Sequence, residues 1–133
     1  MARILIVDDS LATRFNLKQI LCENDFEIAG EAANGEEAVK KFVELKPDLV
    51  TMDITMPVMD GITACRKIKE IAPNACIVMI TALGQQTKVL EAIKAGASNY
   101  ILKPFNSEKT ASVLNAVLEK KLTIKEAVLI ESR

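Results

Sequence analysis

Five short runs of apolar residues, separated by helical stretches, constrain the fold of this chain most strongly. The runs lie at residues 4–7, 26–32, 49–53, 75–80 and 100–102. Continuous apolar and β-branched runs favour strands that are covered on both faces, as in parallel sheets. Helices between consecutive strands imply right-handed crossovers. The pattern therefore predicts an α/β fold with a doubly wound five-stranded parallel sheet, in the flavodoxin-like order 2-1-3-4-5.

The intervening segments carry the caps and spacing of amphipathic helices. Ser10 or Asp9 can cap the first helix, and Asn34 with Glu37 forms a capping box at the start of the second. Gly96 is the left-handed residue expected just past the fourth helix. By spacing, the side chains expected on the apolar face of the first helix are Leu11, Phe15, Leu17, Leu21 and Cys22.

Length and charge indicate one domain. The chain has 133 residues, 50% of them hydrophobic, and a formal net charge of −1. It is therefore neither disordered nor basic enough for a broad nucleic-acid-binding face. The run at 4–7 is too short for a signal peptide or a membrane span. We expect a cytoplasmic monomer that contacts neither nucleic acid nor membrane.

The C-terminal segment is expected to lie outside the domain. We place the domain at residues 1–120 and a helical or flexible C-terminal extension at 121–133. Residues 123–126 have the pattern of a capping box that would open a second short helix, although no Gly or Pro prevents simple continuation. The apolar run 127–130 could pack on the domain, mediate self-association or begin a docking segment, and we expect packing.

The chain contains no histidine and three cysteines. Without histidine there are no Ser-His or Cys-His nucleophile pairs and no imidazole bases. Cys22, Cys65 and Cys76 form no CxxC pair, so neither a disulfide framework nor a zinc site is indicated, and we expect small core residues. Any chemistry must therefore use carboxylates, Lys, Thr or Ser.

Polar side chains stand at the C-terminal ends of four of the five strands. Asp8 and Asp9 follow the first strand, Asp53 ends the third, Thr81 follows the fourth and Lys103 the fifth. Each alone has an ordinary explanation: a helix cap, a strand end before a proline, a β residue or a solvated loop lysine. In the predicted order, however, these ends meet at one rim of the sheet, where ligands bind in open α/β folds. The joint occurrence favours a site.

Three clustered carboxylates need compensation. Two unit charges ~4 Å apart cost ~4 kcal/mol at an effective dielectric near 20. Mg²⁺ suits the cluster because it accepts one or two carboxylates and keeps positions open for phosphate oxygens. Asp8 and Asp9 suit the metal, and Lys103 adds a second positive charge. Asp53 is then a candidate nucleophile on phosphorus, and Thr81 can donate its hydroxyl to a phosphoryl oxygen.

Four motifs in order resemble the receiver domain of bacterial two-component response regulators. They are VDDS at 7–10, MDITMPVMDG at 52–61, TA at 81–82 and KPF at 103–105. The similarity covers about residues 2–120. Because no DNA-binding output domain follows, the chain is most similar to the single-domain chemotaxis members.

The resemblance implies an acceptor and a metal site. Asp53 would accept a phosphoryl group from the histidine of a CheA-like histidine kinase. Asp8, Asp9, Asp53 and the backbone carbonyl of Thr55 would hold Mg²⁺. The Thr55 side chain would lie where the hydrolytic water approaches.

The resemblance also implies a switch. Lys103 would pair with the phosphoryl group or the acceptor, and the bond before Pro104 would be cis. The hydroxyl of Thr81 would move toward the phosphoryl group while the ring of Tyr100 turns inward, although Tyr100 also reads as a half-buried strand aromatic. Residues 85–95, Tyr100 and the last helix would bind partners.

These expectations describe a binding module operated by phosphorylation, which catalyses only its own phosphorylation and dephosphorylation. Its target would be a flagellar motor switch protein or another phosphorylation-dependent partner, and a phosphatase would be a further partner. The alternative within signalling is a phosphorelay intermediate in another pathway, such as sporulation.

Two alternatives come from other classes of protein. Aspartate-nucleophile phosphatases carry a second Asp two positions after the nucleophile, where this chain has Thr55. Flavodoxin-type flavin carriers need a phosphate-cradling loop after the first strand, where Asp8 and Asp9 would repel phosphate in the absence of metal. Both are therefore disfavoured.

Overall fold

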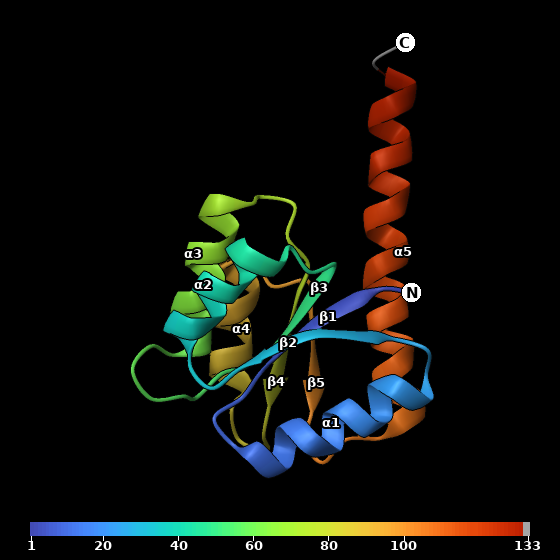
Figure 1. Ribbon diagram of the computed structural model, residues 1–133. Helices are drawn as coiled ribbons and strands as arrows, with labels where there is room; N and C mark the ends of the chain where they lie inside the picture. Colours follow the sequence, from blue (N-terminus) through green and yellow to red (C-terminus); the bar gives the residue numbers. More distant parts are fainter. Residues whose placement is uncertain (132–133) are drawn as a thin grey trace.

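The five predicted strands form one parallel sheet in the order β2-β1-β3-β4-β5, which confirms the predicted fold (Figure 1). The structure, a computed structural model, describes the backbone of residues 1–131 and the side chains of residues 1–120. The strands are β1 (Arg3–Val7), β2 (Glu27–Ala32), β3 (Leu49–Asp53), β4 (Ile77–Thr81) and β5 (Asn99–Leu102).

Helices cover both faces of the sheet. Helices α2, α3 and α4 pack side by side on one face, and α1 and α5 lie together on the other (Figure 1). The arrangement is doubly wound, as the alternation of strands and helices predicts. The helices are α1 (Leu11–Glu23), α2 (Gly35–Leu45), α3 (Gly61–Ile71), α4 (Gln86–Lys94) and α5 (Ser107–Glu131).

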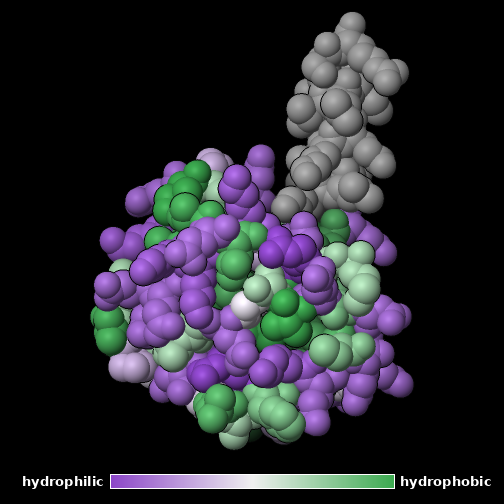
Figure 2. Space-filling view, in the orientation of Figure 1, coloured by the Kyte–Doolittle hydropathy of each residue, from purple (hydrophilic) through white to green (hydrophobic). Residues whose placement is uncertain are grey.

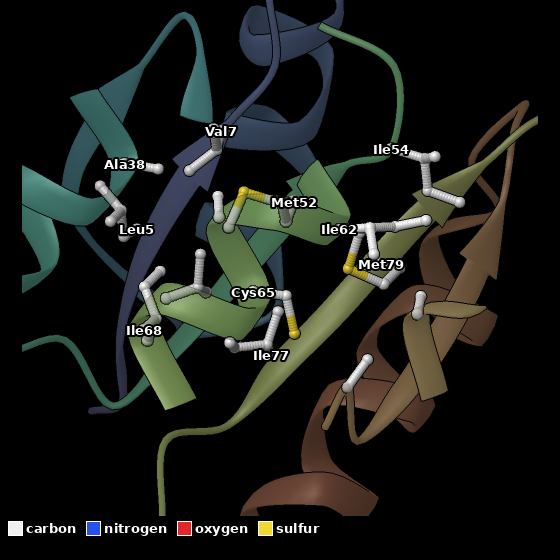
Figure 3. Close-up of a cluster of buried hydrophobic side chains, with 14 of the residues drawn as sticks. Leu5, Val7, Ala38, Met52, Ile54, Ile62, Cys65, Ile68, Ile77 and Met79 are labelled. Atoms are coloured by element: carbon white, nitrogen blue, oxygen red, sulfur yellow. The ribbon is translucent and has the colours of Figure 1, made fainter. Parts of the chain in front are cut away.

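Two apolar clusters, one on each face, hold the central strands in place. All residues of β3 and β4 are buried. Figure 3 shows Met52 and Met79 on the face toward α3, near Ile62 and Cys65, which belong to the same cluster. Because each fully buried large apolar side chain contributes roughly 1.5–3 kcal/mol, this two-sided burial fixes where β3 ends and thus where Asp53 lies.

The predicted apolar face of α1 is wrong in part. Leu17 and Leu21 are buried together with Ile20, but Leu11 is 71% and Phe15 58% exposed. At about 100° per residue, Leu11 and Phe15 point roughly 120° and 160° away from Leu17, so the helix carries two separate apolar stripes. Only the stripe that contacts the sheet and α5 is buried, and apolar surface shows over α1 at the lower end of the molecule (Figure 2).

Two of the three cysteines are buried and one is exposed. Cys65 and Cys76 are buried, as expected of small core residues, whereas Cys22 is exposed. Cys22 lies on the side of α1 that faces away from the sheet, so the expectation for this residue is wrong.

The predicted N-cap residues Ser10 and Asn34 are confirmed, although Glu37 accepts from the Asn34 side chain at 3.1 Å and not from its backbone N–H as a capping box requires. The Ser10 side chain accepts a hydrogen bond from the Thr13 backbone N–H, and the Asn34 side chain accepts one from the Glu37 N–H. Past the end of α4, Gly96 has φ +109°, the left-handed conformation that glycine adopts without strain. Ser10 and Asn34 thus set the starts of α1 and α2 at the rim where the strands end, and Gly96 sets the end of α4 at the opposite edge of the sheet.

Helix α5 continues without interruption through residue 123 to Glu131, so no second helix begins there. The predicted packing of the apolar run 127–130 concerns side chains outside the described residues. The division between a domain at 1–120 and an extension at 121–133 stays a prediction. Within the part of the chain that the structure describes, no helix combines the length and apolar character needed to cross a membrane.

Candidate functional site at the carboxyl ends of the strands

Three carboxylates meet where β1 and β3 end. These strands are direct neighbours, with Val7 opposite Met52, so the residues that follow them, Asp8 and Asp53, lie side by side. One oxygen from each of Asp8, Asp9 and Asp53 lies within 4.8 Å of the others. Asp8 is 3% and Asp53 8% exposed, whereas Asp9 is open to solvent. The structure therefore brings together the acidic residues that the strand ends predicted.

Lys103 brings a positive charge to this cluster. Its Nζ lies 3.1 Å from Asp8 Oδ2 and 3.7 Å from Asp53 Oδ1. The backbone holds the residue at this end of the sheet, because the Lys103 N–H donates to the carbonyl of Thr81 at 2.8 Å. The Lys103–Pro104 peptide is cis, as expected. One ammonium thus faces two buried carboxylates and cannot neutralise both.

The electrostatics of Asp53 reflect this imbalance. Burial, followed by the nearby charges of Asp8 and Asp9, raises the pKa of Asp53 from 3.8 to about 6, while Lys103 and the backbone N–H of Ile54 act in the opposite direction. A carboxylate whose charge is poorly compensated gains most when a cation or a phosphoryl group with its counter-charges arrives. A cation or a phosphoryl group bound beside Asp53 would therefore stabilise the charged form of this carboxylate.

The donor set fits a hard divalent cation. Carboxylate oxygens that converge without intervening hydrogen bonds are the ligands that Mg²⁺ prefers. Asp8 Oδ2 is buried and accepts no hydrogen bond, and the Lys103 ammonium lies 3.1 Å from it. Thr55, whose carbonyl the sequence resemblance adds to the ligand set, follows Asp53 by two residues in the same loop. The residues present are therefore suited to the ion.

The loop after β3 holds helix α3 tightly against Asp53. The Gly61 N–H donates to the carbonyl of Ile54 at 2.8 Å, and a Cβ added at Gly61 would lie 2.0 Å from the backbone carbonyl oxygen of Asp53. Asp60 caps α3 by accepting from the Thr63 N–H at 2.8 Å. The Asp60-Gly61 pair at the start of α3 thus positions the backbone of the acceptor candidate.

The two predicted switch residues line one open pocket beside this cluster. Thr81 is 2% exposed at the end of β4, and Tyr100 is 47% exposed on β5. In the β4–β5 pairing, Tyr100 is opposite Met79, two residues before Thr81. The residues that line the pocket are Thr81, Ala82, Leu83, Gly84, Gln86, Val89, Tyr100 and Leu102.

Two residues at the site had no predicted role in it. Arg14 Nη1 donates to the carbonyl of Asp8 at 2.6 Å and its Nε pairs with Glu31, so it anchors the backbone of one carboxylate. Gln85, predicted only as the start of the partner surface, contacts Thr81 and Thr55. The only sequence signal for Arg14 was its place four residues after the cap residue Ser10, which puts it in the first turn of α1, near the end of β1. No sequence signal pointed to Gln85, because its contacts depend on the conformation of the loop after β4.

Comparison with known proteins identifies the family of this chain. The response regulator receiver domain family matches residues 4–115, and the chain therefore belongs to that family. Within the family it is a CheY-like domain, similar to the chemotaxis protein CheY of Thermotoga maritima, with 55% identity over 86% of this chain and 96% of the relative. The Bacillus subtilis CheY is 53% identical over 87% of this chain and 97% of its own.

Solved structures show the same similarity. A Borrelia burgdorferi complex of CheX with CheY, BeF₃ and Mg²⁺ contains a chain that matches with a TM-score of 0.83 and 42% identity, over 87% of this chain and 88% of that one. The order 2-1-3-4-5 is the one for which flavodoxin and CheY are standard examples. The chain is thus a signalling domain of the CheY type.

Proposed function

We propose that this protein is a chemotaxis response regulator that accepts a phosphoryl group on Asp53 from a CheA-like histidine kinase. The observation that carries the proposal is the buried Asp53 carboxylate, which lies beside Asp8 and Asp9 and 3.7 Å from the Lys103 ammonium. Relatives of more than 50% identity named as CheY support the chemotaxis assignment. A phosphorelay intermediate in another pathway remains the alternative.

In this proposal, Asp53 is the nucleophile. A carboxylate oxygen of Asp53 attacks phosphorus, the bond from phosphorus to the imidazole nitrogen of the donor breaks, and the imidazole leaves with the electron pair of that bond. Lys103, which pairs with Asp8 and Asp53 at rest, pairs with the transferred group afterwards. Mg²⁺ held by Asp8, Asp9, Asp53 and the Thr55 carbonyl would neutralise charge on the phosphoryl oxygens.

The output is a change in the surface formed by residues 85–95, Tyr100 and α5. The Thr81 hydroxyl moves toward the phosphoryl group and the Tyr100 ring turns into the space it leaves. The pocket between Thr81 and Tyr100, and the exposed apolar side chains of Leu90 and Ile93 on α4, support a docking role for this face. Its target is a flagellar motor switch protein or another phosphorylation-dependent partner.

The remaining assignments complete the proposal. Residues 1–120 form the receiver unit and 121–133 an extension, in a cytoplasmic monomer. The Borrelia relative forms a complex with CheX, and we place a CheX-like protein where the sequence resemblance placed a phosphatase. The protein catalyses only its own phosphorylation and dephosphorylation. At the position where aspartate-nucleophile phosphatases carry a second Asp, the exposed Thr55 hydroxyl accepts a hydrogen bond from Gln85.

Intact-mass measurement after incubation with acetyl phosphate and Mg²⁺ tests this function. The wild type is expected to gain one phosphoryl group, and Asp53→Asn none, because an amide oxygen is a poor nucleophile. A wild type that gains nothing, or an Asp53→Asn variant that gains as much, would overturn the proposal. Omitting Mg²⁺ provides the control for the metal, since the three carboxylates then repel the incoming phosphoryl group.

A further inference from the structure

The side chain of Gln85 connects the two residues on either side of the acceptor site. Its Oε1 accepts a hydrogen bond from the Thr81 hydroxyl at 3.2 Å and one from the Ala82 backbone N–H at 2.9 Å. Its Nε2 donates to Thr55 Oγ1 at 3.1 Å. One carboxamide thus joins the loop after β3 to the end of β4.

The orientation of this carboxamide follows from its neighbours. The backbone N–H of Ala82 can only donate, so the oxygen of Gln85 must face it and the nitrogen must face Thr55. In this orientation the carboxamide oxygen accepts from the Ala82 N–H and the Thr81 hydroxyl, and the carboxamide nitrogen donates to the Thr55 hydroxyl oxygen. The Ala82 N–H, the Thr81 hydroxyl and both ends of the carboxamide thus have hydrogen-bond partners within one network.

This network competes with the switch. A threonine hydroxyl has one proton. Two acceptors lie within reach of Thr81 Oγ1, the Ala82 carbonyl at 3.3 Å and, slightly closer, Gln85 Oε1 at 3.2 Å, to which the hydroxyl can donate a hydrogen bond. Thr81 can donate to a phosphoryl oxygen only if it gives up this bond. The contact with Gln85 and the contact with a phosphoryl group on Asp53 are therefore mutually exclusive for the hydroxyl proton.

We propose that Gln85 is a positioning residue that holds the resting state, by keeping the Thr81 hydroxyl turned away from the acceptor until phosphorylation displaces it. This inference rests on the proposed function, because it concerns the same switch. In energetic terms, Gln85 favours the resting conformation, and the pre-existing active population is smaller with it than without it. Removing one neutral hydrogen bond shifts such an equilibrium roughly three- to tenfold.

The same residue connects the site to helix α4. Gln85 is the N-cap residue of α4, and its backbone carbonyl accepts from the Val89 N–H at 3.0 Å. Its side chain makes no capping hydrogen bond to the helix, because it points back to Thr81 and Thr55. Release of the side chain therefore frees the first turn of α4 from the site without removing a cap, and α4 forms part of the proposed partner surface.

The test compares two variants at this position with a matched control. Gln85→Ala removes the carboxamide, and Gln85→Met removes it while keeping the length of the side chain, which separates lost hydrogen bonds from lost packing. Gln19→Ala makes the same chemical change at an exposed position of α1. Each protein is labelled at its threonine methyl groups for NMR, and its initial rate of phosphorylation by acetyl phosphate with Mg²⁺ is measured by intact mass.

Both Gln85 variants are expected to shift the Thr81 methyl resonance of the unphosphorylated protein toward its position in phosphorylated wild type. They are expected to accept the phosphoryl group roughly three- to tenfold faster. Gln19→Ala should match wild type in both readouts. If wild type is phosphorylated but the Gln85 variants keep its resting resonance and rate, or react more slowly, this inference is overturned alone. If wild type is not phosphorylated, the proposed function fails first.

Discussion

The ammonium of Lys103 lies closer to Asp8 than to Asp53, at 3.1 Å against 3.7 Å. The acceptor candidate is therefore the carboxylate with the weaker compensation, and burial together with its acidic neighbours raises its pKa to about 6. At neutral pH the ionised Asp53 carboxylate is therefore electrostatically unfavourable, and substitutions that change the charge of the site should change the stability of the protein.

Asp53→Asn is expected to stabilise the metal-free protein at pH 7 and above by about 3 kcal/mol. The pKa of Asp53 rises from 3.8 in the unfolded chain to about 6 in the folded one, so its ionisation opposes folding. This cost is absent below pH 3.8, grows as the pH rises through this window, and is complete above about 6. Urea unfolding in EDTA at a series of pH values measures it. A stabilisation of equal size at pH 4 and pH 8 would contradict this origin.

Lys103→Met is expected to destabilise the metal-free protein by about 1–2 kcal/mol, because it leaves buried carboxylates without their cation. The estimate is discounted from that for a fully buried pair, since the Lys103 side chain is 29% exposed. Added Mg²⁺ should recover much of the loss, since it supplies charge to the same oxygens. Urea unfolding with and without Mg²⁺ measures the loss of stability in each condition. Equal losses with and without the ion would argue against the view that Lys103 and Mg²⁺ compensate the same carboxylates.

Gly61→Ala is expected to destabilise the protein by roughly 2–4 kcal/mol. The added Cβ would lie 2.0 Å from the Asp53 carbonyl oxygen, a backbone atom that cannot move aside cheaply. Gly84→Ala is the control: its Cβ meets nothing within 4 Å, so only the strain of φ +90° remains, about 1 kcal/mol. Denaturation midpoints compare the two, and equal losses would show that the close approach at Gly61 is not what matters.

Thr81→Ala is expected to accept a phosphoryl group and yet lose phosphorylation-dependent partner binding. The hydroxyl of Thr81 is not part of the nucleophile, but it is the proposed link to Tyr100, with which it lines one pocket. Intact mass reports the first property. The second is followed through the response of Tyr100 fluorescence to phosphorylation, because partner binding is proposed to depend on the movement of that ring. A phosphorylated Thr81→Ala protein with a wild-type response at Tyr100 would remove Thr81 from the switch.

The sheet and the cluster at its rim could be predicted because they follow from short-range rules. Apolar runs fix the strands, and the ends of adjacent parallel strands must meet, which brings Asp8 and Asp53 together without knowledge of any loop. The exposed side of α1 could not be predicted in the same way. Periodicity shows that Leu11 and Phe15 form a stripe, but only the packing of the whole helix decides which stripe is buried.

The role of Gln85 lay beyond the sequence for a different reason. Its contacts with Thr81 and Thr55 depend on the path of the loop after β4, which includes Gly84 at φ +90°. No periodicity specifies such a path. Strand ends predict which residues meet at the rim of the sheet, whereas residues such as Gln85 that connect neighbouring loops can be identified only from the structure.

The central claim is that the state of Asp53 determines the surface around Tyr100, and one fluorescence measurement tests it most directly. Tyr100 is the only tyrosine and the chain has no tryptophan, so tyrosine emission reports on that ring alone. On addition of acetyl phosphate and Mg²⁺ to the wild type, we expect the emission to change at the rate at which the phosphoryl group is gained, and Asp53→Asn to show no change. An unchanged emission in fully phosphorylated wild type would contradict the account.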